Sequence, residues 1–202
     1  MSSIFELIQA AGYFGFFAII FLESSVPIGI IFPGDGLLFG VGLFAANNSL
    51  SLWLCVALAV IGAISGYFAG YWLGAKFGPK IFVKENSLFF NKKYLEKTRK
   101  FYEKYGKKTI FLARFIPIIR TFAPIAAGMG QMTKRDFFAY NIVSGLVWGA
   151  GLIFLGYGAG VFLLDFIDAK TLSVIVFIFI QVVILFSILP AIIKAVKENK
   201  KS

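Results

Sequence analysis

Residues 109–132 read TIFLARFIPIIRTFAPIAAGMGQM. The stretch is apolar enough to lie in a bilayer, yet it carries Arg114 and Arg120 and contains Pro117 and Pro124. Proline removes an intrahelical hydrogen bond and tends to break a helix. A charged side chain facing hydrocarbon costs several kcal/mol unless it is paired or hydrated. The stretch therefore predicts a broken helical segment inside a membrane, with Pro117 and Pro124 as the breaks.

The composition of the whole chain agrees with a membrane protein. Of 202 residues, 59% are hydrophobic and 15% are charged, and the mean hydropathy is +0.84. An ordinary soluble domain carries more charge and less apolar sequence. Because one helical span takes about 20 residues, residues 1–202 suit a single all-α, polytopic membrane domain.

Charge and missing motifs exclude several classes of function. The net charge is +10, but the basic residues avoid the apolar segments, so we expect anionic lipid and not nucleic acid as the partner. The chain has no histidine, which many phosphatases and most zinc sites use. It also has no GxSxG, HExxH, P-loop or paired-cysteine motif. We expect neither an enzyme nor a metal or cofactor site.

The first half, residues 10–75, begins with an apolar stretch that is interrupted before residue 46. The interruptions are Glu23, Pro27, Pro33, Gly34 and Asp35. They predict a helix followed by a broken, re-entrant segment at about 24–46. A turn at 47–49 then leads into a span at 50–74, which carries a glycine at every fourth position from Gly62 to Gly74. Small residues at this spacing favour close helix packing in lipid.

Residues 76–108 hold eleven basic and three acidic side chains, which places this segment in the cytoplasm by the positive-inside rule. Four aromatic residues and one threonine recur in it at helical spacing, at Tyr94, Thr98, Phe101, Tyr102 and Tyr105. The pattern predicts an amphipathic helix on anionic headgroups. A solvated basic face that only sets the topology is the alternative.

The second half, residues 109–160, is predicted to repeat the first, with chance matching in a glycine-rich chain as the alternative. Gly42, Gly70, Tyr71 and Gly74 recur 86 positions later as Gly128, Gly156, Tyr157 and Gly160. Further spans are expected at 137–160 and 171–193. If 109–132 enters and leaves from the cytoplasmic side, every basic cluster and both termini lie in the cytoplasm. The two halves are then inverted repeats, as in many secondary transporters.

Four ionisable residues lie within apolar sequence: Glu23, Asp35, Arg114 and Arg120. Broken helices can turn them toward a common cavity. Two arginines there suit a phosphate, since arginine keeps its charge and one guanidinium can donate two hydrogen bonds to two phosphate oxygens. A buried carboxylate can take up a proton, so Glu23 and Asp35 are the predicted proton-coupling residues. The alternative is that an acid only neutralises an arginine to hold the fold.

The sequence resembles the DedA family, whose eukaryotic relatives share a VTT-type domain. The resemblance extends from about residue 12 to 190. In the first half it rests on Phe21-Leu22-Glu23, Phe32-Pro33-Gly34-Asp35, Leu37-Leu38, Gly66-Tyr67, Gly70 and Gly74. In the second it rests on Ala113 to Pro117, Arg120, Pro124, Ala127-Gly128, Met132, Phe137, Asn141, Gly145 and Trp148.

The resemblance implies two opposed re-entrant loops and a lipid transporter or flippase of the bacterial cytoplasmic membrane. Its implied cargo is undecaprenyl phosphate, and its implied coupling is to protons. It assigns substrate binding to Arg114 and Arg120 and proton coupling to Glu23 and Asp35. Ser65 stands where many members have an acid, so coupling would rest on those two carboxylates.

Three alternatives remain at this stage. A glycerophospholipid flippase or scramblase would use the same arginines. A proton-cation antiporter would use the carboxylates but leave the arginines unexplained, and a lipid phosphatase would need a carboxylate nucleophile. The oligomeric state, a homo-oligomer included, also stays open.

Overall fold

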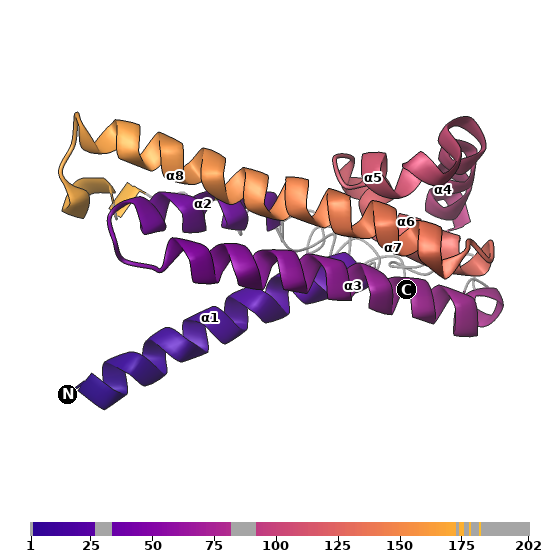
Figure 1. The fold of residues 1–202 in the computed structure, drawn as a ribbon, viewed down its shortest axis with the longest axis horizontal. Helices are drawn as coiled ribbons and strands as arrows, with labels where there is room; N and C mark the ends of the chain where they lie inside the picture. The colour runs from indigo at the N-terminus through magenta and orange to yellow at the C-terminus, as the bar shows by residue number, and fades with distance from the viewer. Residues whose placement is uncertain are drawn as a thin grey trace, which may run out of the picture. The chain divides into compact units, whose positions relative to one another are not determined.

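The computed structural model describes residues 2–26, 34–81 and 92–172, together with positions 174, 175, 178 and 182. This described part is helical and contains no strand, as predicted (Figure 1). Its elements are α1 (Ser2–Ser25), α2 (Gly34–Ala46), α3 (Leu52–Ile81), α4 (Lys92–Tyr105), the 3₁₀ turn η2 (Gly106–Lys108), α5 (Thr109–Ala113), α6 (Pro117–Met129), α7 (Lys134–Gly145), the π-helical η3 (Leu146–Ala150) and α8 (Gly151–Leu164).

The chain divides into two compact units. Unit 1 comprises residues 1–30 and 58–150, and unit 2 comprises residues 31–57 and 151–202. Unit 1 therefore contains α1, most of α3, and α4 through η3, whereas unit 2 contains α2 and α8.

Within the described residues, two helical runs are long and apolar enough to cross a membrane, Leu52–Gly78 and Lys134–Leu164. They correspond to the spans predicted at 50–74 and 137–160. The first run belongs to α3, which continues past Gly74 to Ile81. The span predicted at 171–193 lies almost entirely outside the described residues.

The stretch 109–132 is broken, but at one proline and not two. α5 ends at Ala113, Ile116 is extended (φ −123°, ψ 104°), and Pro117 begins α6. Proline forces the preceding residue out of the helical region and fits the first helical position well. Pro124 was predicted as a second break, but α6 runs through it. The Pro124 ring would lie 3.1 Å from a Cβ at Gly70 of α3. The proline removes one backbone hydrogen bond of α6, but its ring packs closely against α3.

The corresponding stretch of the first half is also divided into separate helices. α1 ends at Ser25 and α2 begins at Gly34. The predicted breaks at Pro27 and Pro33 lie outside the described residues, and the re-entrant course of both segments remains a prediction.

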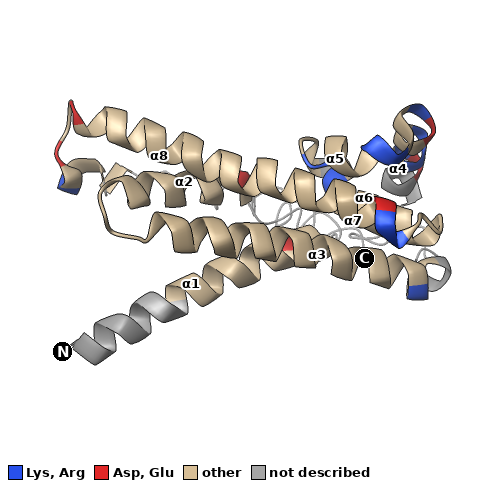
Figure 2. Cartoon of the chain, in the orientation of Figure 1, with Lys and Arg blue, Asp and Glu red and all other residues tan. Residues whose placement is uncertain are grey.

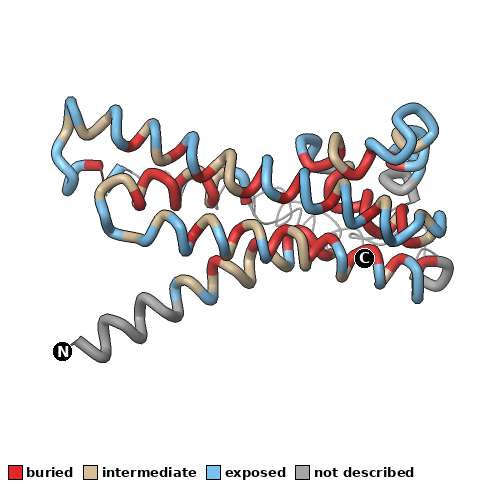
Figure 3. The backbone as a smooth tube through the Cα atoms, viewed as in Figure 1, coloured by how far each residue is buried: buried red, intermediate tan, exposed pale blue. Residues whose placement is uncertain are grey.

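The glycine ridge of α3 is a packing surface in unit 1. A Cβ at Gly66 would lie 2.5 Å from the carbonyl oxygen of Phe21 in α1, and one at Gly74 would overlap the Ile125 carbonyl of α6. Glycine alone lets these backbones approach so closely. Buried residues accordingly gather along α6 and the middle of α3 (Figure 3).

Unit 2 uses the same kind of contact between α2 and α8, which run side by side (Figure 1). A Cβ at Gly42 would overlap the carbonyl oxygen of Ile153, and one at Gly156 would overlap that of Phe39. Each unit thus packs a short helix of one predicted repeat on the long helix of the other, α6 on α3 and α2 on α8.

The basic helix α4 carries much of the positive charge of the described chain (Figure 2). Its less polar face packs on α6, with Thr98 buried and the Tyr102 hydroxyl donating to the Ala123 carbonyl at 3.1 Å. Burial raises the pKa of Tyr102, so this phenol stays a neutral donor. The predicted helix is confirmed, and protein covers part of the face that was expected to meet headgroups.

Candidate functional site

Among the described residues of unit 1, three charged side chains are buried together. They are Glu23 from α1, Arg114 from the break after α5, and Arg120 from the first turns of α6. Glu23 is 0% exposed, Arg114 1% and Arg120 5%. Such burial of charge inside apolar helices is expensive, so each group requires partners supplied by the fold.

Arg120 and Glu23 form an ion pair, in which Nη2 of Arg120 donates to Oε1 of Glu23. The pair joins α6 to α1 across 97 positions of sequence. Because both charges are shielded from water, removing one partner would leave the other uncompensated in a low dielectric.

Arg114 is held by a separate set of hydrogen bonds. Its Nε donates to Ser144 Oγ at 2.8 Å, and its Nη2 donates to Asn141 Oδ1 at 2.5 Å and to the Ala63 carbonyl at 3.1 Å. Asn141 in turn donates to the Ile64 carbonyl at 2.9 Å. Asn141 and Ser144 are three residues apart on α7 and therefore share one helix face. This network holds the Arg114 side chain in one position.

Trp148 lies beside both arginines, and Tyr67 lies against Arg114. The Arg114 guanidinium lies 3.9 Å from the centre of the Tyr67 ring and 5.9 Å from that of Trp148, and Arg120 lies 4.9 Å from Trp148. These are cation–π distances. Trp148 belongs to the π-helical stretch η3, and such local widenings of a helix are frequent at functional sites.

The cluster also contains polar atoms without a protein partner. Among the described residues, neither the Tyr67 hydroxyl nor Nη1 of Arg114 has a hydrogen-bond partner, although both are buried. Buried polar atoms are normally satisfied by protein, water or ligand. These two atoms mark a place where a water molecule or a ligand oxygen fits chemically.

Three of the four predicted site residues therefore lie in one cluster, and the proline break brings both arginines to Trp148. Asp35 lies in unit 2, exposed in the first turn of α2, where a negative charge suits the helix dipole. Its predicted role in proton coupling stays a prediction.

Sequence reasoning did not assign Tyr67, Asn141, Ser144 or Trp148 to the site. The pair of polar residues three apart within an apolar span was the available signal for Asn141 and Ser144. Tyr67 and Trp148 could have been suspected only through the family resemblance, because aromatic residues are common throughout these spans.

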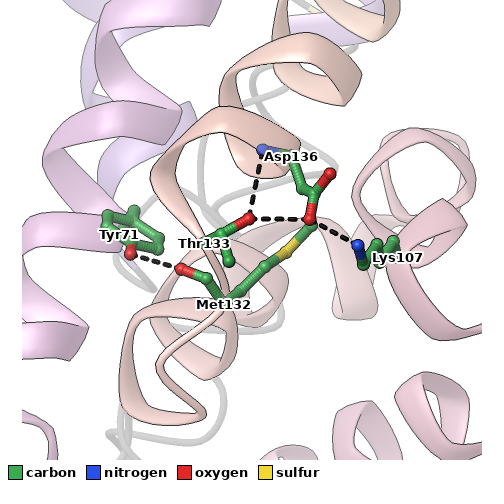
Figure 4. A network of polar contacts seen from close by, with 5 residues as sticks. All are labelled: Tyr71, Lys107, Met132, Thr133 and Asp136. Atoms are coloured by element: carbon green, nitrogen blue, oxygen red, sulfur yellow. Dashed lines mark hydrogen bonds and ion pairs between the residues drawn. The ribbon is translucent and has the colours of Figure 1, made fainter.

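A second polar network closes the turn between α6 and α7 (Figure 4). The Tyr71 hydroxyl donates to the Met132 carbonyl at 2.6 Å. The Thr133 side chain caps α7 by accepting from the backbone N–H of Asp136 at 3.4 Å, and Lys107 pairs with the Asp136 carboxylate at 2.5 Å. These contacts hold the turn that follows α6 and the start of α7.

Comparison with known proteins identifies the family. A model of the VTT domain matches residues 32–158. The chain is 40% identical to Protein DedA of Escherichia coli (strain K12) over 186 residues. These residues make up 91% of this chain and 82% of that protein. The chain belongs to the DedA family.

Other relatives of this DedA-family chain are named as membrane proteins. An uncharacterized membrane protein of Mycobacterium tuberculosis (strain H37Rv) is 37% identical over 189 residues, covering 91% of this chain and 78% of the relative. Inner membrane protein YqjA of Escherichia coli (strain K12) is 30% identical over 148 residues, which make up 73% of this chain and 67% of that protein. No solved structure matches. Together with the two long apolar helices, these relatives show a polytopic membrane protein.

Proposed function

We propose that this DedA-family protein is a lipid transporter, not an enzyme, and that it carries undecaprenyl phosphate to the cytoplasmic leaflet of a bacterial inner membrane. Both termini are cytoplasmic in this proposal. The family membership, the relative named as an inner membrane protein and the buried cluster of Glu23, Arg114 and Arg120 support it.

The observation that carries the proposal is the charge of the cluster. Its three buried ionisable side chains sum to one positive charge when all are ionised. In a low-dielectric setting an additional anion is strongly attracted to such a group. A phosphate headgroup supplies that anion and accepts the paired N–H donors of a guanidinium.

The two arginines have different roles in this scheme. Arg114 is committed to Ser144, Asn141 and Ala63, so it supplies a fixed positive charge. Arg120 is held by the Glu23 carboxylate, which an arriving phosphate can replace. When phosphate takes the place of Glu23 on Arg120, the displaced carboxylate is buried beside a new anion, which favours its protonation. Binding of the lipid and uptake of a proton are therefore linked.

Linked binding is testable with purified protein in detergent and a pH-indicating dye at pH 8. There a phosphate monoester is already a dianion, because its second pKa is about 6. When undecaprenyl phosphate is added, the wild-type protein should take up about one proton for each lipid that it binds, because binding and protonation are linked. Glu23→Gln should bind without proton uptake. Glu96→Gln, which changes an exposed acid of α4, should behave as wild type.

Two results would count against the scheme in different ways. Binding by the wild-type protein without proton uptake would remove Glu23 from the coupling. Proton uptake on adding a glycerophospholipid, with none on adding undecaprenyl phosphate, would favour the alternative of a glycerophospholipid flippase or scramblase.

A further inference from the structure

A cavity of about 470 Å³ lies in unit 1 beside α4 and the C-terminal end of α6, away from the buried arginines. Its apolar lining includes Ala126, Ala127, Met129 and Met132, and the basic side chains Arg99 and Lys107 also line it. The volume falls within the range of small-molecule sites. An apolar pocket bordered by cations matches an amphiphile with an anionic head.

Both cations are accessible from outside. The Arg99 side chain is 80% exposed and that of Lys107 is 63% exposed. Arg99 pairs with Glu103 through Nε, and Lys107 pairs with Asp136. A guanidinium has five N–H donors and an ammonium has three, so both residues keep donors for phosphate oxygens.

The surrounding charge favours an anionic ligand despite those two acids. Residues 92–108 contain eight basic and two acidic side chains, and the basic helix belongs to a membrane protein. Clusters of this kind are attracted to anionic lipid surfaces. An ordinary membrane lipid is thus present at high local concentration wherever α4 meets the headgroups.

We propose that this pocket binds one membrane phospholipid with a net negative charge, whose phosphate lies on Arg99 and Lys107 and whose acyl chain lies along Ala126 and Met129. The site is separate from the cluster of Glu23, Arg114 and Arg120, and its occupancy does not depend on which lipid is transported. Because Ala126 and Met129 belong to the same helix as Arg120, the bound lipid also supports the helix that holds the transport site.

Native mass spectrometry of the delipidated, full-length protein tests the site, with dioleoylphosphatidylglycerol and dioleoylphosphatidylcholine as probes. The wild-type protein should retain one phosphatidylglycerol in preference to phosphatidylcholine. The double variant R99Q/K107Q should lose about tenfold in affinity, the change expected from losing two charge-assisted contacts.

A matched control distinguishes binding in this pocket from a general attraction of anionic lipid to the positive charge of α4. K97Q/K100Q removes the same charge from exposed positions of α4 that do not line the cavity, and it should bind nearly as wild type. Ala126→Phe keeps every charge but fills the apolar part of the pocket, and it should lose affinity like R99Q/K107Q. Equal losses in the two charge variants, unaltered binding by Ala126→Phe in monodisperse protein, or no preference for phosphatidylglycerol would overturn the proposal.

Discussion

Glu23→Ala is expected to lower the free energy of unfolding by about 3 to 5 kcal/mol, because it leaves the Arg120 guanidinium charged and buried without its carboxylate. Arg120→Ala should have an effect of the same size for the converse reason. The measurement is thermal or denaturant unfolding of the purified protein in a single detergent, followed by tryptophan fluorescence.

The double variant E23Q/R120Q distinguishes a fold-stabilising pair from a transport site. Replacing both charges with neutral amides removes the uncompensated charge, so the double variant should be markedly more stable than either alanine variant. It should still not transport lipid, because the exchangeable positive charge is gone. Lys97→Gln, which neutralises an exposed side chain of α4 that belongs to neither site, should change stability little.

A purely structural pair would give a different pattern. In that case E23Q/R120Q would recover transport along with stability. If the effects of Glu23→Gln and Arg120→Gln on the free energy of unfolding summed to the effect of E23Q/R120Q, Glu23 and Arg120 would not interact in the folded protein.

Gly128→Ala is expected to destabilise the protein by about 2 to 3 kcal/mol. The added methyl group would overlap the carbonyl oxygen of Tyr71 and lie 2.7 Å from the backbone nitrogen of Ala75. Both obstacles are backbone atoms, so no side chain can rotate away, and α6 must move off α3. Since α6 carries Arg120, transport should fall as well. Thermal unfolding and lipid transport are the two measurements.

Gly15→Ala provides the matched control. A Cβ at Gly15 would meet nothing within 4 Å, and alanine favours a helix by about 1 kcal/mol relative to glycine. This variant should be as stable as wild type or slightly more stable. If Gly128→Ala were also as stable as wild type, the close approach of α6 to α3 at Gly128 would be contradicted.

Much of the fold could be predicted because strong local signals agreed with one another. Proline at position 117 fixes the start of α6, and the four-residue spacing of Gly62, Gly66, Gly70 and Gly74 identifies the packing face of α3. The effect of Pro124 could not be predicted, because a proline inside a helix is tolerated or not according to its neighbours. Here the neighbour is Gly70, which comes from a distant part of the chain.

The candidate site could be predicted in its charges but not in its pairing. Glu23, Arg114 and Arg120 stand out because ionisable residues are rare in apolar sequence. That Arg120 pairs with Glu23, whereas Arg114 binds Asn141 and Ser144, depends on the packing of α1, α6 and α7. Local spacing contains no information about that packing.

Transbilayer movement of undecaprenyl phosphate in proteoliposomes tests the central claim most directly. The wild-type protein should move this lipid faster than a glycerophospholipid, a pH gradient should accelerate the movement, and Arg120→Ala should abolish it. Lys97→Ala, an exposed change on α4, should leave the rate unchanged. Movement of undecaprenyl phosphate no faster than in protein-free liposomes, or equal rates for wild type and Arg120→Ala, would contradict the account.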